Sequence, residues 1–184
     1  GNITVVSGLP RSGTSMMMQM LDSGGMSVFS DGLREADDNN PKGYFEFEKV
    51  KALARDNSWV GDAEGKVVKV IAQLLRFLPN TYNYKVVFMQ RDLKEIIRSQ
   101  QIMLKKDPEV YPMAIADVFK KELEKTSAWM ESQANIDVLY VNYSDVIDSP
   151  IGVASKVNEF FNEQLDISEM VKAVDKKLYR NKAD

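Results

Sequence analysis

A strand, a glycine-bounded loop and a helix follow one another at the start of the chain. Residues 3–6 are apolar and mostly β-branched, which predicts a buried strand. Residues 14–22 have a helical pattern, and a Ser-Gly-Gly sequence ends it. Gly8 and Gly13 bound the loop between these two elements. The backbone N–H groups of such a loop and the positive end of the helix bind phosphate-like anions, so we expect an anion site here.

Strands and helices alternate along the rest of the chain. Strands are predicted at residues 3–6, 66–71, 85–90 and 136–141. Helices are predicted at 14–22, 47–59, 74–78, 92–104 and 113–133. Two further helices are predicted, one that begins at Pro150 with Ser149 as its N-cap, and one that runs from an Asp166 N-cap to residue 178. Residues 27–43 are expected to form a loop, and residues 143–145 a turn. This alternation predicts a three-layer α/β/α fold with a parallel central sheet, in one domain over residues 1–184. The glycine loop after the first strand makes this fold similar to the P-loop nucleoside triphosphate hydrolase type.

Composition excludes several classes of function. The net charge of −3 over 184 residues leaves no broad basic surface for nucleic acid. The chain has no cysteine and no histidine, which excludes disulfides, thiolate or imidazole metal ligands, and a histidine base; we expect no metal. No apolar run approaches the ~18 residues of a membrane span, and the first strand begins too early for a signal peptide. We therefore expect a cytoplasmic protein, whose oligomeric state stays open.

The loop has the spacing of a Walker A motif but a different charge pattern. Ser15 stands where the Walker serine or threonine would stand, whereas Thr14 replaces the lysine that grips nucleotide phosphates. A cation appears inside the loop instead, at Arg11. The sequence Pro10-Arg11-Ser12-Gly13-Thr14-Ser15 resembles the 5′-phosphosulfate loop of sulfotransferases, P-[KR]-S-G-T-[ST]. The resemblance implies that these six residues bind 3′-phosphoadenosine 5′-phosphosulfate (PAPS), with Arg11 on the sulfate and the 5′-phosphate.

Two later segments are also similar to that family. Arg91, directly after a predicted strand, and Ser99, eight residues on, resemble the pair that binds the 3′-phosphate of PAPS. The alternative is structural: Arg91 would form an ordinary ion pair, and Asp92 at the helix N-terminus would interact favourably with the helix dipole. Residues 138–150 are similar to the family's "YEDL…DP" segment, where Tyr143 is expected to fix the turn.

The resemblance also suggests catalytic groups. Lys69 resembles a strand lysine that precedes an "LP" segment, although a strand-end lysine often simply faces water. The histidine base of the small-molecule enzymes would fall at position 71, which is Ile71. Residues 40–46 resemble an "NPxGYxE" element of bacterial sulfotransferase-like proteins, so Glu46 is the candidate base. Glu48 and Asp31 stand behind it, and a helix cap is the alternative role of Glu46.

The expected function is transfer of a sulfuryl group from PAPS to a hydroxyl or amine of an unknown small-molecule or carbohydrate acceptor, with 3′-phosphoadenosine 5′-phosphate (PAP) as product. The family's late GxxGxxK loop is absent, and only Lys177 or Arg180 of a basic tail could replace it. Two alternatives stay open. One is a P-loop kinase or nucleotide phosphotransferase with Asp92 as its Walker B acid. The other is a non-catalytic nucleotide-binding relative.

Overall fold

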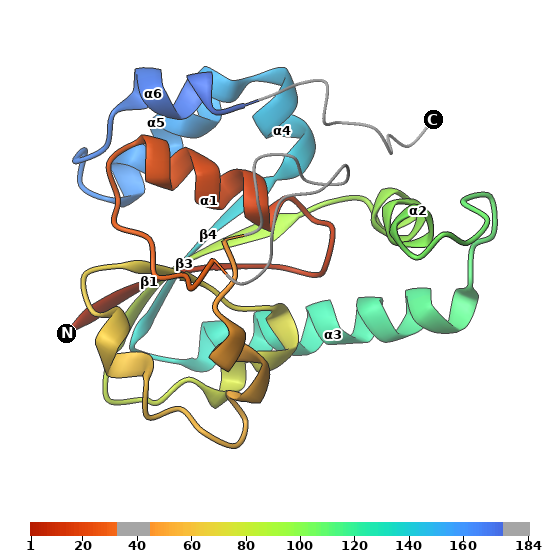
Figure 1. Cartoon of the computed structure of the whole chain (residues 1–184), viewed down its shortest axis with the longest axis horizontal. Coiled ribbons are helices and arrows are strands. Elements are labelled where there is room, and N and C mark those ends of the chain that lie inside the picture. The colour runs from red at the N-terminus through yellow and green to blue at the C-terminus, as the bar shows by residue number, and fades with distance from the viewer. Residues whose placement is uncertain (33–44, 175–184) are drawn as a thin grey trace.

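Four parallel strands form the central sheet in the order β2-β1-β3-β4 (Figure 1). The computed structural model describes residues 1–32 and 45–174. The strands are β1 (Asn2–Ser7), β2 (Val67–Lys69), β3 (Asn83–Gln90) and β4 (Ile136–Asn142). Val5 at the centre of β1 is in register with Val68 on one side and Val86 on the other. All four predicted strands and their parallel arrangement are thus confirmed.

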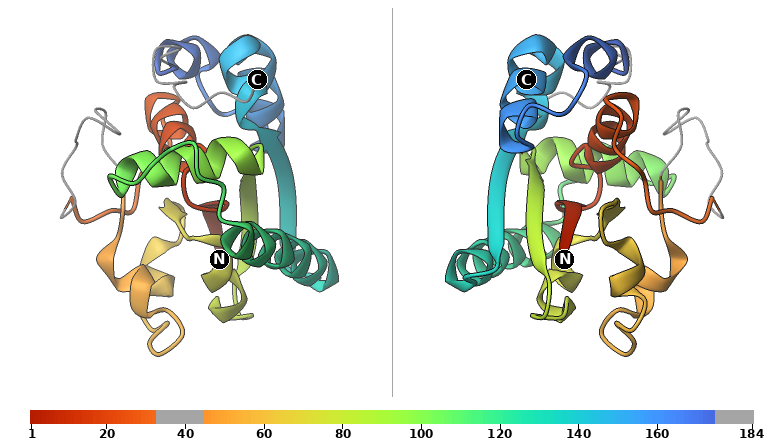
Figure 2. Two further views of the ribbon diagram at one scale, coloured as in Figure 1. Left: turned by 90° about the vertical axis from the view of Figure 1, so that its right-hand side faces the viewer. Right: turned by 90° about the vertical axis from the view of Figure 1, so that its left-hand side faces the viewer.

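Helices cover both faces of the sheet (Figures 1 and 2). The α-helices are α1 (Thr14–Ser23), α2 (Leu93–Met103), α3 (Met113–Ser132), α4 (Tyr143–Asp148), α5 (Pro150–Phe160) and α6 (Ile167–Lys172). The 3₁₀ helices are η1 (Glu48–Ala52), η2 (Val60–Ala63) and η3 (Ala72–Phe77). Helices α1, α4, α5 and α6 lie on one face, and α3 with the 3₁₀ helices lies on the other (Figure 1).

Alternate residues of the central strands point into two separate cores. Val5 and Val86 are fully buried in the core on the α3 side, whereas Val6 and Val87 are fully buried in the core on the α1 side. Successive side chains of a strand point to opposite faces, so apolar runs in β1 and β3 fill both cores. The expected three-layer α/β/α architecture of the P-loop type is therefore confirmed.

The prediction of a continuous helix at residues 47–59 is wrong. The segment instead contains the 3₁₀ helix η1 followed by turns, and η2 begins directly after it. Its apolar residues Phe47, Val50 and Leu53 recur every third position, which is the repeat of a 3₁₀ helix. The carboxylate of Asp56 then accepts hydrogen bonds from the backbone and the hydroxyl of Ser58 (3.0 and 2.6 Å), which favours a turn over a continued helix.

Smaller differences concern short segments. The short helix expected at 74–78 is the 3₁₀ helix η3. The turn expected at 143–145 is the helix α4. Within the segment expected to be a loop, Val28 forms a single parallel bridge with Val67. The Asp166 cap is confirmed, since its carboxylate accepts from the Glu169 N–H (3.1 Å), but the predicted helix end at 178 lies outside the described residues.

Candidate active site at the carboxyl edge of the sheet

Each of the four strands brings one polar side chain to the same edge of the sheet. Arg11 follows β1 in the glycine loop, and Lys69 is the last residue of β2. Arg91 is the first residue after β3, and Tyr143 is the first after β4. Carboxyl ends of parallel strands meet at one edge, which is where open α/β sheets bind their ligands. The topology therefore gathers residues that lie far apart in the sequence.

The glycine loop is held in shape from inside. A Cβ added to Gly8 would lie 2.5 Å from the Ser12 hydroxyl oxygen and 2.9 Å from the Met89 carbonyl oxygen, so only glycine fits there. The Ser12 hydroxyl donates a hydrogen bond to the Leu9 carbonyl (2.6 Å), and Ser12 is only 1% exposed. Among the six loop residues predicted to bind PAPS, the side chain of Ser12 thus shapes the loop.

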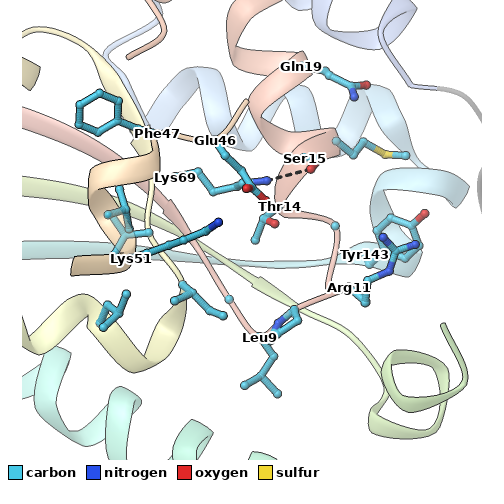
Figure 3. A pocket seen from close by; sticks show the side chains of 18 of the residues that line it. Leu9, Arg11, Thr14, Ser15, Gln19, Glu46, Phe47, Lys51, Lys69 and Tyr143 are labelled. Atoms are coloured by element: carbon cyan, nitrogen blue, oxygen red, sulfur yellow. Dashed lines mark hydrogen bonds between the residues drawn. The ribbon is translucent and has the colours of Figure 1, made fainter. Parts of the chain in front are cut away.

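The other five loop residues line a cavity of about 310 Å³, together with Glu46 and Lys69 (Figure 3). The Lys69 ammonium donates a hydrogen bond to the Ser15 hydroxyl (3.0 Å). Lys69 is thus half-buried and turned toward the loop, not toward bulk water. In kinase-type P-loops the equivalent hydroxyl binds Mg²⁺. In this structure the Lys69 ammonium lies beside the Ser15 hydroxyl oxygen.

Beside the loop, the two arginines and Ser99 form a cluster that we call the arginine corner (Arg11, Arg91 and Ser99). Arg11 Nε–H donates to Ser99 Oγ (2.8 Å), and Arg91 Nη1–H donates to the Arg11 carbonyl (2.8 Å). The Arg91 guanidinium also pairs with the Glu95 carboxylate (3.2 Å), and both side chains are 7% exposed. The expected alternative, an ion pair of Arg91, is therefore present together with the contact to the loop.

The three residues of the arginine corner differ in how accessible they are to a ligand. Arg11 lines the first cavity, and Arg91 lines a second cavity of about 350 Å³. The second cavity is lined by Gln90, Arg91, Asp92, Glu95, Asn142 and Ser144. Ser99 is 1% exposed and its oxygen accepts from Arg11, so a ligand meets Ser99 only through a change in this hydrogen bond.

Tyr143 is a site residue that the sequence analysis assigned only to a turn. Its ring contacts the loop so closely that a Cβ on Gly13 would lie 2.5 Å from Tyr143 Cδ2. The Arg91 guanidinium stacks on the same ring, 4.4 Å from its centroid. Burial raises the pKa of the Tyr143 phenol, with Arg91 and Arg11 acting in the opposite direction. The phenol therefore keeps its proton near neutral pH, and its place directly after a strand was the signal for this role.

Among the candidate bases, the structure places only Glu46 on the cavity wall (Figure 3). The Asp31 carboxylate accepts a hydrogen bond from the Glu48 backbone N–H (2.7 Å) and so caps η1. The Glu48 carboxylate in turn accepts from the Lys51 ammonium (3.0 Å). The cap that the sequence suggested for Glu46 is thus supplied by Asp31, and Glu46 is placed beside the loop.

The groups invoked by the kinase alternative lie elsewhere. The Asp92 carboxylate accepts from the backbone N–H groups of Lys94 (2.8 Å) and Glu95 (3.3 Å), which makes it the N-cap of α2. Asp92 borders the second cavity and not the one beside Ser15. Within 1–32 and 45–174, no group of three or more acidic side chains is arranged to hold a metal ion. Lys177 and Arg180 lie outside the described residues.

No helix in the described part of the chain is both long and apolar enough to cross a lipid bilayer.

Comparison with known proteins gives a likeness in structure only. No protein-family model matches the sequence, and no curated protein matches it either. A sulfotransferase of Mycobacterium tuberculosis H37Rv, STF1, superposes with a TM-score of 0.61 at 17% identity, over 94% of this chain and 70% of that chain. The sulfotransferase domain of the curacin biosynthetic pathway gives 0.54 at 17% identity, over 95% and 78%.

A third structure is mouse SULT7A1, which is complexed with PAP. It gives a TM-score of 0.53 at 16% identity, and the match covers 97% of this chain and 63% of that one. The chain therefore has the three-layer, P-loop-type fold of the sulfotransferases.

Proposed function

We propose that this chain is a PAPS-dependent sulfotransferase, which moves a sulfuryl group from PAPS to a hydroxyl or amine of an acceptor. The observation that carries the proposal is the set of cations around the phosphate loop. Arg11 lies inside the loop, and Lys69 contacts the Ser15 hydroxyl (3.0 Å) at the start of the loop's helix. Such a site can neutralise a phosphosulfate without a metal ion, because a sulfuryl group carries less charge than a phosphoryl group.

The loop residues have the chemistry to hold the donor substrate. Backbone N–H groups at the start of α1 and the hydroxyls of Thr14 and Ser15 can donate to the 5′-phosphosulfate, and Arg11 adds a charge-assisted contact. Arg91, on the neighbouring cavity, is the residue proposed for the 3′-phosphate, with Ser99 behind it. Tyr143, whose ring packs against Gly13 and under the Arg91 guanidinium, lines the same cavity as the loop.

The transfer step needs few catalytic groups. The acceptor oxygen or nitrogen forms a bond to sulfur while the bond from sulfur to the bridging phosphate oxygen breaks, and the electron pair leaves with PAP. Glu46 takes the acceptor proton as general base. Arg11 and Lys69 offset the negative charge that develops on the leaving phosphate, so that positioning and electrostatic stabilisation supply most of the rate.

The competing functions have less support. A P-loop kinase needs an acid for Mg²⁺ near the loop, and Asp92 caps α2 beside a different cavity. A non-catalytic nucleotide-binding relative would use the same loop, but it would have no use for a carboxylate on the cavity wall. Turnover separates this second alternative from the enzyme.

Calorimetric titration with PAP and with ATP, each with and without Mg²⁺, tests the proposal. We expect PAP to bind without Mg²⁺ and ATP to bind weakly under either condition. ATP binding that requires Mg²⁺ would favour the kinase. PAP binding without any transfer of sulfate from PAPS across a broad panel of alcohols and amines would favour the non-catalytic relative.

A further inference from the structure

Met103 is the last residue of α2 and lines the cavity beside the phosphate loop. Its sulfur accepts a hydrogen bond from Arg11 Nη1–H (3.9 Å), while Nε–H of the same guanidinium bonds Ser99. A thioether sulfur is a weak acceptor, so it competes little with a bound anion for the guanidinium. The strength of the acceptor beside Arg11 therefore depends on the chemical state of one sulfur atom.

The sulfur atoms of this chain all belong to methionines, and most of these are closed to solvent. The chain has ten methionines and no cysteine. Seven methionines are at most 6% exposed: Met16, Met17, Met18, Met20, Met89, Met130 and Met170. Met113 is 63% exposed, Met26 and Met103 are half-buried, and of these three Met103 alone lines the cavity beside the loop. A small oxidant that enters this cavity therefore meets a thioether in contact with Arg11.

We propose that Met103 is a site of reversible oxidation by hydrogen peroxide, and that its sulfoxide weakens anion binding at the phosphate loop. The Met103 sulfur attacks one peroxide oxygen, so that an S–O bond forms while the O–O bond breaks. The other oxygen leaves as water with both protons of the peroxide. The sulfur loses the electron pair that the peroxide gains. Reductases return methionine sulfoxide to methionine, which makes the change reversible.

The sulfoxide oxygen changes the competition for Arg11. It is a polar acceptor on the sulfur that already accepts from Arg11 Nη1–H. A charge-assisted hydrogen bond to this oxygen holds Arg11 in its contact with Ser99 and occupies a donor that would otherwise turn to the ligand. Oxidation thus gives the guanidinium an internal partner that competes with the phosphosulfate. The inference rests on the proposed function in one respect, that the loop binds an anion.

Two matched variants isolate the oxidation of Met103. The double variant Met26→Leu, Met113→Leu keeps Met103 as its accessible methionine, whereas Met103→Leu keeps the other two. Each protein is treated with hydrogen peroxide, and mass spectrometry of its peptides locates the sulfoxides. PAP and inorganic pyrophosphate are titrated by calorimetry before and after treatment, so that each protein is its own reference.

The expected loss is confined to the protein that keeps Met103. Oxidation should weaken both anions by roughly three- to tenfold in the double variant, which corresponds to one hydrogen bond of ordinary strength. It should change neither affinity in Met103→Leu. Treatment with the two methionine sulfoxide reductases, one for each epimer, should restore the affinity of the double variant. Adding Arg11→Ala to the double variant should abolish the effect of oxidation, because the partner of the sulfoxide is gone.

A second comparison decides the matter if peroxide unfolds the double variant, as its unfolding transition would reveal. Met103→Gln places a carbonyl oxygen on a side chain of similar length, whereas Met103→Leu keeps this position apolar. PAP should bind to Met103→Gln roughly threefold more weakly than to Met103→Leu, because the amide oxygen is the stronger acceptor for Arg11. Equal affinities of these two variants would overturn the inference without any use of peroxide.

The outcomes distinguish this inference from the proposed function. Peroxide that oxidises Met113 of the unchanged chain but leaves Met103 intact overturns the inference, as does an anion affinity that ignores the Met103 sulfoxide. Either result, with PAP still bound, leaves the sulfotransferase standing. If PAP does not bind but pyrophosphate binds and is weakened by oxidation, the proposed function falls and the inference stands. If neither anion binds, both fall.

Discussion

The arginine corner and the apolar wall of the first cavity (Phe47, Val50 and Leu74) border neighbouring cavities but are built in opposite ways. In the arginine corner, hydrogen bonds fix charged groups to one another, as in the 2.8 Å contacts from Arg11 to Ser99 and from Arg91 to the Arg11 carbonyl. In the apolar wall, packing alone fixes side chains such as Val50, whose position depends on the core behind it. The comparison teaches that this fold arranges anion recognition by paired polar contacts and leaves the opposite surface to hydrophobic shape.

Substitutions in the two regions should also have different consequences. A change in the arginine corner removes an ion pair or hydrogen bonds from buried groups, whereas a change in a half-buried wall residue such as Leu74 alters mainly the shape of the surface. Substitutions at the corner should therefore affect folding and donor binding together. Substitutions at the wall should affect the acceptor alone.

The largest effect is expected for the candidate base, which lies between the two regions. Glu46→Gln removes the proton acceptor but keeps the size of the side chain, so turnover should fall by about 10²–10⁴-fold. PAP affinity, measured by titration, should stay unchanged because the donor contacts are elsewhere. Glu48→Gln, an exposed neighbour whose carboxylate pairs with Lys51, is the control. Full activity of Glu46→Gln would remove this residue as the base.

Arg91→Ala tests whether the arginine corner is held together by its buried charges. The substitution removes the ion pair to the 7% exposed Glu95 carboxylate and the bond to the Arg11 carbonyl, so the free energy of unfolding should fall by about 3–5 kcal/mol. Chemical denaturation measures it. Glu109→Ala breaks the exposed Arg98–Glu109 pair and should lower stability by roughly 0–1 kcal/mol. Equal losses in both variants would contradict the structural role of the corner.

Arg11→Ala should have the smallest of the three effects, and it should appear in binding. Loss of the charge-assisted contact weakens PAP binding by about 1.5–3 kcal/mol, which corresponds to roughly 10- to 150-fold in the dissociation constant. Calorimetric titration measures the loss. Arg55→Ala, an exposed arginine that does not line the cavity, should bind PAP as the unchanged chain does. Unaltered affinity of Arg11→Ala would show that the anion is held by the backbone alone.

The central fold could be predicted because its signals are local. Short apolar runs such as 85–90 indicate buried strands, and Asp92 and Asp166 cap helices where the sequence suggested helix starts. The strand order β2-β1-β3-β4 depends on pairing between distant segments, for which one sequence contains no direct signal. The 47–59 segment failed for another reason: apolar residues spaced by three were assigned to a 3.6-residue helix.

The site was predicted in part, for similar reasons. The loop residues, Lys69 and Arg91 stand in short motifs or at strand ends, and the structure brings them to one edge of the sheet; their roles in binding and catalysis stay predictions. The stacking of Tyr143 beneath Arg91 needed the fold, because it joins residues 52 positions apart. The apolar wall carries no motif at all, since its residues are also ordinary core residues in the sequence. The extent of the predicted single domain over 1–184 likewise stays a prediction.

Arg11 has a backbone conformation that has a consequence beyond binding. Its φ of 63° lies in the left-handed region, which is unfavourable by about 1–2 kcal/mol for any residue other than glycine. The Arg91 bond to the Arg11 carbonyl helps to hold this conformation. Glycine at position 11 would adopt this backbone without that penalty but would lose the 2.8 Å bond to Ser99, so the loop accepts local backbone strain while it presents a cation to the cavity.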